Sequence, residues 1–276
     1  MKRLTYLASL LLAAAPAPAA RAQSLLSRDE QNVVNFAFAT QLGSGIYSVS
    51  GRTLQIYRLP FSHTIRPADE GAFGIELTLP VTLGFFDFEL QDIDDGDIPR
   101  SVDSLSFVPG LKFVIELQPA WTLEPRVEAG IARAGDANAH ANVYAIGVAS
   151  LYEFDGQGFD WLLRNDLTLA GVELRGTSGS DRMARLQTVL TASRPFGRES
   201  GADYLLYALN EYYVDQPGGP VDSAVQGGRS MQYEVGITFG WRETRRIWNI
   251  PLPRVGIGYR FGSNLDVLRI VVGAPF

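Results

Sequence analysis

Residues 73 to 85 read FGIELTLPVTLGF and alternate between apolar and small or polar side chains. Phe73, Ile75 and Leu77 begin the apolar series, while Gly74 and Glu76 lie between them. Successive side chains of a β-strand point to opposite faces, so this period of two predicts a strand with one apolar face. Such a strand is longer than those typical of a soluble β-sandwich.

The same alternation recurs along the chain, most clearly in residues 105–117, 121–131 and 231–241. Twelve segments of this kind lie between turn signals, and they start near residues 44, 52, 72, 104, 121, 141, 159, 182, 202, 229, 253 and 265. The orientation of the segments near 182 and 202 stays open. Two apolar sets compete for one face there, Tyr204, Leu206 and Tyr212 against Leu205, Tyr207 and Tyr213.

The face opposite the apolar side chains carries charges. These candidate residues are Glu76, Lys112, Glu116, Glu124, Arg126, Glu128, Arg164, Asp166 and Glu234. In a soluble sandwich they would form the solvated exterior, whereas in an outer-membrane barrel they line the lumen and the apolar face meets lipid. The length of the strands favours the barrel, because crossing a membrane takes about ten tilted residues.

The connections between the segments alternate between short turns and long polar loops, as the two unlike rims of a membrane barrel require. Gln118–Ala120 and Asp155–Gly158 are short, while Glu89–Asp103 and Gln216–Arg229 are long. All four tryptophans fall beside connections of one rim, where membrane barrels carry an aromatic girdle. They are Trp121, Trp161, Trp241 and Trp248.

The last segment alternates from Leu268 to the terminal Phe276. A terminal phenylalanine on the lipid face resembles the signal that the barrel-assembly machinery recognises. We therefore predict an all-β fold, a transmembrane antiparallel β-barrel of about twelve strands with a short N-terminal helix in or near the lumen.

The N-terminus has the regions of a secretory signal peptide, with Lys2 and Arg3 before an apolar stretch and Ala20-Arg21-Ala22 at its end. We assign residues 1–22 to the signal peptide, 23–42 to an N-terminal segment and 43–276 to the barrel. A capping box at Ser27–Glu30 and a stop at Gly43 predict a helix over residues 28–42 in the lumen. The alternative is an additional strand, because Val34, Phe36 and Phe38 also alternate.

Composition excludes several classes of protein. The chain of 276 residues has no cysteine, so it has no disulfides and no thiolate metal or redox site. Its formal charge of −6 becomes −9 when Lys2, Arg3 and Arg21 leave with the signal peptide, which makes a nucleic-acid partner implausible. No apolar run is long enough for a transmembrane helix.

Twelve strands after one helix resemble the translocator β-domain of autotransporters, and more closely the solitary autotransporter-like outer-membrane barrels. The resemblance rests on Gly43–Tyr47, Leu79–Phe85 and Phe276. It implies a helix inside the lumen. The chain departs from the family in two ways: Gln23–Leu26 leaves no room for a passenger, and Asn32 and Asn35 are not the adjacent asparagine pair of a self-cleavage junction.

Candidate catalytic residues are few. Ser62 and His63 are adjacent on a strand and point to opposite faces, and no His-x-Ser triplet of the outer-membrane phospholipase type occurs. His140 lies near Asp136 without the Asp-x-His arrangement of omptin-like proteases. The loop Asp92–Asp97 suggests calcium, but its spacing does not fit an EF-hand loop. We predict no catalytic residue, no metal and no cofactor.

These observations predict a Gram-negative outer-membrane protein with a structural, pore or translocation role and no enzymatic activity. Its expected partners are outer-membrane lipid and the barrel-assembly machinery. Glu124, Arg126 and Glu128, spaced about 7 Å apart on one strand face, either pair into a plug or line a selective pore. Two alternatives stay open: an outer-membrane hydrolase or lipid-modifying barrel, and an adhesin that acts through Glu89–Asp103 and Gln216–Arg229.

Overall fold

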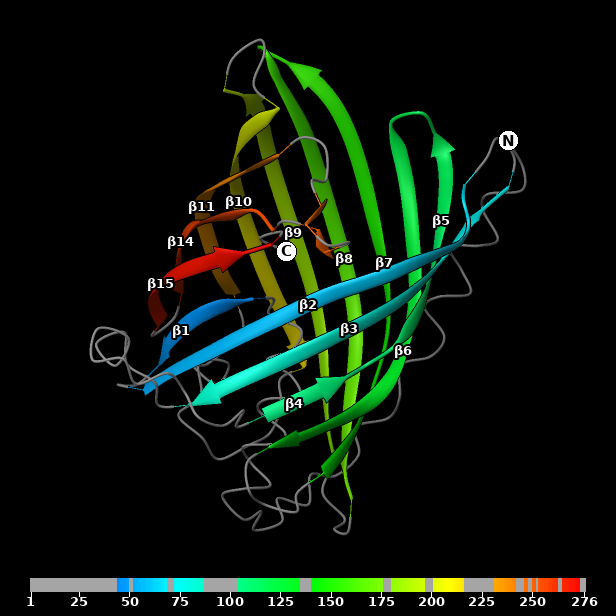
Figure 1. Cartoon of the computed structure of the whole chain (residues 1–276), viewed down its shortest axis with the longest axis vertical. Coiled ribbons are helices and arrows are strands. Elements are labelled where there is room, and N and C mark those ends of the chain that lie inside the picture. Colours follow the sequence, from blue (N-terminus) through cyan, green and yellow to red (C-terminus); the bar gives the residue numbers. More distant parts are fainter. Residues whose placement is uncertain are drawn as a thin grey trace.

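The structure is a computed structural model that describes residues 44–49, 52–68, 72–86, 104–134, 140–175, 180–196, 201–215, 231–241, 246–247, 250–251, 253–262 and 265–273. This part of the chain is all-β (Figure 1). The strands are β1 (Gly45–Val49), β2 (Arg52–Arg66), β3 (Gly74–Phe86), β4 (Ser104–Phe107), β5 (Gly110–Gln118), β6 (Trp121–Ala134), β7 (His140–Gly156), β8 (Phe159–Leu174), β9 (Ser180–Pro195), β10 (Ala202–Asp215), β11 (Met231–Trp241), β12 (Arg246–Ile247), β13 (Ile250–Pro251), β14 (Val255–Gly262) and β15 (Leu265–Val272).

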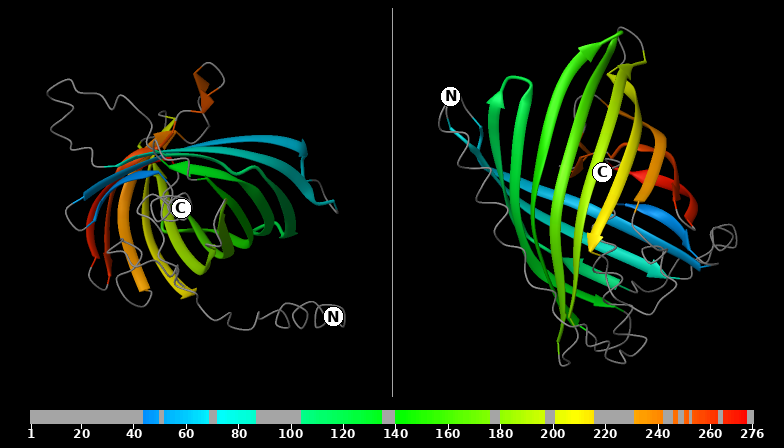
Figure 2. Two further views of the ribbon diagram at one scale, coloured as in Figure 1. Left: turned by 90° about the horizontal axis from the view of Figure 1, so that it is seen from below. Right: turned by 180° about the vertical axis from the view of Figure 1, so that it is seen from behind.

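The strands of the main sheet pair antiparallel with their neighbours in chain order. The pairing also joins the first strand to the last, with Gly45 of β1 opposite Val271 of β15. Because β2 pairs with both β1 and β3, the hydrogen-bonded pairs form a continuous circuit. Figure 2 shows the sheet curving round when it is seen from below.

The twelve predicted strands agree with the described sheet. The strand predicted near residue 104 is interrupted, because β4 and β5 lie end to end between β3 and β6 with Val108 and Pro109 between them. Proline has no N–H for the ladder, which explains the break. The short pair β12–β13 was not predicted.

Several predictions fall outside the described residues. They concern the signal peptide, the helix over residues 28–42, the loop Asp92–Asp97, Asp136, Trp248 and Phe276. Within the described ranges, no helix combines the length and the apolar character that crossing a membrane requires.

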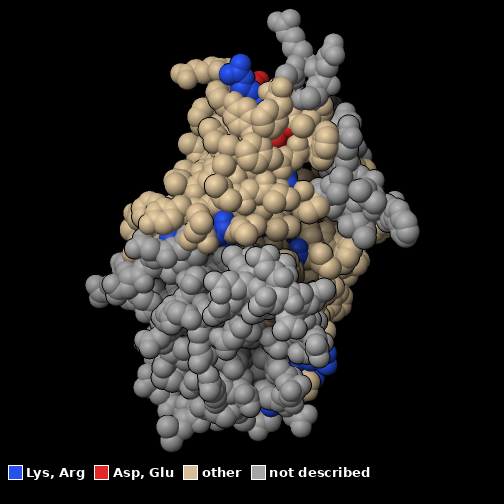
Figure 3. All heavy atoms as spheres, turned by 60° about the vertical axis from the view of Figure 1, so that its left-hand side comes forward, with Lys and Arg blue, Asp and Glu red and all other residues tan. Residues whose placement is uncertain are grey.

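Large apolar side chains cover the outer face of the sheet. Val127 and Ile131 of β6, Ile146 of β7 and Leu169 of β8 are all exposed. The described part of the surface in Figure 3 accordingly carries few charged side chains. Charged residues are instead buried on the inner face, among them Asp166 and Glu234. This distribution is the inverse of that in a soluble protein.

The orientation of β9 and β10 is now defined. Leu206 and Tyr212 are exposed on the outer face, while Tyr207 and Tyr213 are buried on the inner face. Leu186 of β9 likewise points outward. The two competing apolar sets therefore divide between the faces, and the inward tyrosines use their hydroxyl groups there.

The two rims of the sheet differ. We call the strand ends that carry Trp121, Trp161 and Trp241 the tryptophan rim, and the ends that carry Arg133 and His140 the opposite rim. Rings touch one another along the tryptophan rim with centroids 5.5–6.3 Å apart. They belong to Tyr152, Phe154, Trp161, Phe159, Tyr204, Phe196 and Phe239.

An apolar cluster fills part of the inner face toward the opposite rim. It includes Val143 of β7, Val172 of β8, Met183 of β9 and Tyr213 of β10, all nearly inaccessible to solvent. The inner face therefore combines a charged middle with an apolar region near the opposite rim.

Candidate functional site

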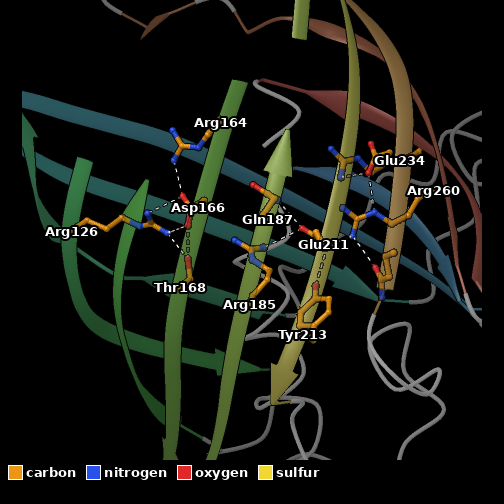
Figure 4. A network of polar contacts seen from close by, with 12 residues as sticks. Arg126, Arg164, Asp166, Thr168, Arg185, Gln187, Glu211, Tyr213, Glu234 and Arg260 are labelled. Carbon is orange, nitrogen blue, oxygen red and sulfur yellow. Dashed lines mark hydrogen bonds and ion pairs between the residues drawn. The ribbon is translucent and has the colours of Figure 1, made fainter. Parts of the chain in front are cut away.

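Most charged residues of the inner face form two connected sets of ion pairs (Figure 4), and Arg254 and Asp203 form a separate pair at 2.7 Å. Network I contains Glu76, Lys112, Glu124, Arg126, Glu128, Arg164 and Asp166. Network II contains Arg185, Glu211, Glu234, Arg260 and Arg269.

Asp166 of β8 is the centre of network I. Arg126 of β6 donates to both of its carboxylate oxygens at 2.8 and 2.9 Å, and Arg164 donates to Oδ2 at 2.8 Å. The Thr168 hydroxyl adds a bond to Oδ1 at 2.7 Å. Gly147 makes room for this arrangement, because a Cβ at that position would come within 2.8 Å of the Arg126 guanidinium.

The other members extend network I toward the tryptophan rim. Arg164 reaches Glu124 at 3.3 Å, Lys112 pairs with Glu124 at 3.3 Å and Lys112 pairs with Glu76 at 2.8 Å. The exposed fraction of the side chains rises along this path, from 4% at Asp166 to 22% at Glu76 and 23% at Lys112. Water therefore reaches the outer members more easily than Asp166.

Glu211 of β10 is fully buried in network II. Its Oε1 accepts from Gln187 at 2.7 Å and from Arg185 at 3.3 Å. Its Oε2 accepts from Tyr213 and from Arg260, both at 3.1 Å. Four donors on one carboxylate offset the cost of removing it from water.

Glu234 of β11 is the second buried carboxylate. Tyr207 donates to its Oε1 at 2.6 Å, while Arg260 and Arg269 donate to its Oε2 at 2.8 and 3.1 Å. Gly258 is needed here, because a Cβ would lie 2.2 Å from the Tyr207 hydroxyl and 2.5 Å from the Glu234 carboxylate. Network II thus ties β9, β10, β11, β14 and β15 together across the inner face.

The networks are close to neutral together. Network I has three cations and four carboxylates, whereas network II has three cations and two carboxylates. Arg58 of β2 attracts Glu128 of network I, whereas Arg126 of network I and Arg185 of network II repel it. Arg58 is therefore close enough to feel the charges of both networks.

The structure brings eight of the nine predicted inner-face residues into these networks. Seven belong to network I and Glu234 belongs to network II, whereas Glu116 is exposed opposite Thr122. Trp121, Trp161 and Trp241 lie at strand ends of one rim. The Trp121 indole donates to Ser150 and the Trp161 indole donates to the Gly156 carbonyl.

Sequence reasoning missed four members of network II. Arg185 and Glu211 lie in the two strands whose orientation the sequence left open. Arg260 and Arg269 had a usable signal, because each stands between two apolar residues of an alternating strand. The inward role of Tyr207 and Tyr213 was likewise not resolved.

The histidines lie away from both networks. His63 of β2 is exposed on the outer face opposite Leu77, and adjacent Ser62 points to the other face. His140 is exposed at the opposite rim, opposite Arg133 of β6. Among the described residues, no group of three or more histidines and carboxylates is placed to hold a metal ion.

Comparison with solved structures finds similar chains, whereas the comparisons of sequence find none. No protein-family model matches the chain, and no curated protein matches its sequence. The structure of LpxR from Salmonella typhimurium is similar with 11% identity and a TM-score of 0.38, over 79% of this chain and 86% of LpxR. At this similarity the match assigns no activity and no residue role to this chain.

The comparison corrects one prediction. We predicted that the chain has no enzymatic activity, and this exclusion is wrong because the similar structure, LpxR, is that of an enzyme. The resemblance to autotransporter β-domains is not tested by these findings and stays a prediction. The adhesin alternative also stays a prediction, since Glu89–Asp103 and Gln216–Arg229 lie outside the described residues.

Proposed function

We propose that the protein is an outer-membrane β-barrel that acts at its lipid-facing surface and rims rather than through an open lumen. The observation that carries the proposal is the inverted distribution of side chains. Large apolar residues are exposed outside while eight charged residues are buried inside. A sheet with this pattern is stable in lipid, where an apolar exterior costs nothing.

The dimensions of the outer face support a membrane location. On β7 the outward positions run from Tyr144 to Phe154, which is about 33 Å of strand and about 25 Å along the membrane normal at a tilt near ~40°. Aromatic residues lie at both ends of this stretch, with Tyr152, Phe154 and Trp161 at the tryptophan rim. An apolar band about 25 Å high between aromatic girdles is typical of outer-membrane barrels.

The interior supports a closed rather than a conducting barrel. Networks I and II pair their charges with one another, and the apolar cluster around Val143 and Val172 occupies the inner face toward the opposite rim. A selective pore would present unpaired charges to passing solutes. The plug interpretation therefore fits the described residues better than the pore.

Two measurements on the refolded chain of residues 23–276 test this proposal. We expect heated and unheated samples to migrate differently on a gel, because a folded membrane barrel resists denaturation until it is heated. We also expect no steady single-channel conductance in planar bilayers. Absence of the gel shift contradicts the barrel. Steady conductance contradicts the closed lumen. If conductance appears only after residues 23–42 are removed, that segment closes the lumen.

A lipid-modifying enzyme is the second candidate function, and the position of His140 favours it. His140 is exposed on the outer face at the opposite rim, and Glu173 lies outward on the neighbouring strand. Histidine is the side chain that most often acts as a general base, and an exposed imidazole at the rim is open to lipid esters. Incubation of the refolded protein with acylated phospholipid should release fatty acid, and His140→Ala should abolish the release while His63→Ala retains it.

A further inference from the structure

Basic side chains form a row across three adjacent strands at the opposite rim. Arg133 of β6 lies directly opposite His140 of β7. The Arg175 backbone, just after β8, donates to the His140 carbonyl at 2.8 Å, which continues the row. Adjacent strands are about 4.8 Å apart, so the three side chains are close neighbours. Arg182 of β9 is opposite Gly171 of β8, four residues before Arg175, so it lies between the row and the apolar band. We call Arg133, His140, Arg175 and Arg182 the rim patch.

The rim patch faces outward. Its four side chains are exposed, and each continues the exposed apolar series of its own strand. Arg133 follows Ile131, His140 precedes Tyr144, and Arg182 precedes Leu186 on the same face. The patch therefore lies on the lipid-facing side and not with the inner networks.

The patch also has the height of a membrane headgroup layer. Tyr144 marks the end of the apolar band on β7, and His140 lies two outward positions beyond it, about 13 Å of strand at ~3.3 Å per residue. Tyr144 covers Gly171, whose Cβ would meet the tyrosine ring at 2.3 Å. Below it, Ile146, Leu167 and Leu169 are exposed and suit acyl chains.

Among the described residues near the patch, arginines outnumber carboxylates on the outer face. Among the described outward positions of β6–β9 near the patch, one residue is acidic. This residue is Glu173, which lies opposite Asn142 and Ser180. The Arg175 Nε donates to Asn142 Oδ1 at 2.8 Å, which orients the guanidinium. Arg133 and Arg175 lie on either side of β7, so an anion between them meets two guanidinium groups. The planar guanidinium of arginine can donate two parallel hydrogen bonds to the oxygens of a phosphate.

We propose that the rim patch binds the phosphate of a lipid headgroup in the leaflet at the opposite rim. The inference rests on the proposed membrane-spanning barrel. A lipid fits better than a free anion because one ligand then meets both features, with its phosphate at Arg133 and Arg175 and its acyl chains on the apolar band below.

Native mass spectrometry of the refolded chain in detergent tests the proposal, with phosphatidic acid as the probe and phosphatidylcholine as the comparison lipid. We expect retention of phosphatidic acid over phosphatidylcholine. Arg175→Gln should weaken retention by about tenfold to a hundredfold, since a charge-assisted bond is worth about 1.5–3 kcal/mol. The variant Arg133→Gln/Arg175→Gln/Arg182→Gln should abolish the preference.

Arg194→Gln is the matched control, because Arg194 is exposed on the outer face of β9 near the tryptophan rim, over the Phe159 ring. It should retain the lipid as the wild type does. Arg175→Lys keeps the positive charge but cannot donate two parallel hydrogen bonds to a phosphate, so it should lose part of the affinity for phosphatidic acid. This single variant tests the proposal if the triple variant does not fold.

Three results overturn the proposal: equal retention by Arg175→Gln and wild type, an equal loss in Arg194→Gln, or full displacement of the lipid by inorganic phosphate. The last result would assign the patch to a free anion. The heat-dependent gel shift is recorded on each sample. A wild-type sample without the shift refutes the barrel itself, whereas a wild-type sample with the shift and without lipid retention refutes the rim patch alone.

Discussion

Networks I and II use the same chemistry in different surroundings. Side chains of network I are 4–23% exposed, while those of network II are 0–5% exposed. Both networks surround their most buried carboxylates with donors, and in network II these donors include tyrosine hydroxyls, which bond Glu211 and Glu234 beside the arginines. The comparison indicates that the interior becomes drier from Lys112 to Glu211, and that the buried carboxylates depend on complete pairing.

The largest effect is expected at Glu211. Glu211→Leu leaves Arg185 and Arg260 buried with fewer anionic partners, and breaking a buried ion pair costs about 3–5 kcal/mol. Urea unfolding of the protein in lipid vesicles, followed by tryptophan fluorescence, measures the loss.

The matched control for this change is Glu116→Leu, which removes an exposed carboxylate from the same sheet. Its effect should stay within about 0.5 kcal/mol. Equal losses for the two variants would mean that the pairing of Glu211 adds nothing, and the distinction between the networks would fail.

An intermediate effect is expected at Asp166, which is as buried as network II but belongs to network I. Asp166→Asn weakens the bonds from Arg126 and Arg164, whose remaining partners are Glu128 and Glu124. The expected loss is about 1.5–3 kcal/mol, the range for bonds to a charged group.

A double-mutant cycle of Asp166→Asn with Arg126→Met isolates the bidentate pair. The cycle should give a clear coupling free energy in urea unfolding. Additive losses would show that the two side chains do not stabilise each other, in spite of their 2.8 Å contact.

The strands were predictable because their signal is local. A period of two in residues 73–85 or 121–131 needs no knowledge of the neighbouring strands. Network I was largely predictable for the same reason, since Glu124, Arg126 and Glu128 repeat on one face.

The partners were not predictable. Arg126 meets Asp166 forty positions along the chain, and that contact depends on the register of β6, β7 and β8. The sequence gives an even weaker signal for Glu211. It is a single carboxylate on a face that also carries Tyr207, Leu209 and Tyr213, so the pattern does not indicate which face is inside. Register and face are properties of the closed set of strands and not of one segment.

The smallest effect is expected at the hydrated end of network I. Lys112→Met breaks the pairs with Glu76 and Glu124, whose side chains reach solvent, so the loss should be about 1 kcal/mol or less. High salt should reduce the difference between wild type and variant, because screening weakens exposed pairs and leaves buried ones nearly unchanged. Urea unfolding at low and high salt measures both quantities. A loss as large as that of Glu211→Leu, insensitive to salt, would mean that Lys112 is as dry as network II, and the gradient of hydration along the inner face would not exist.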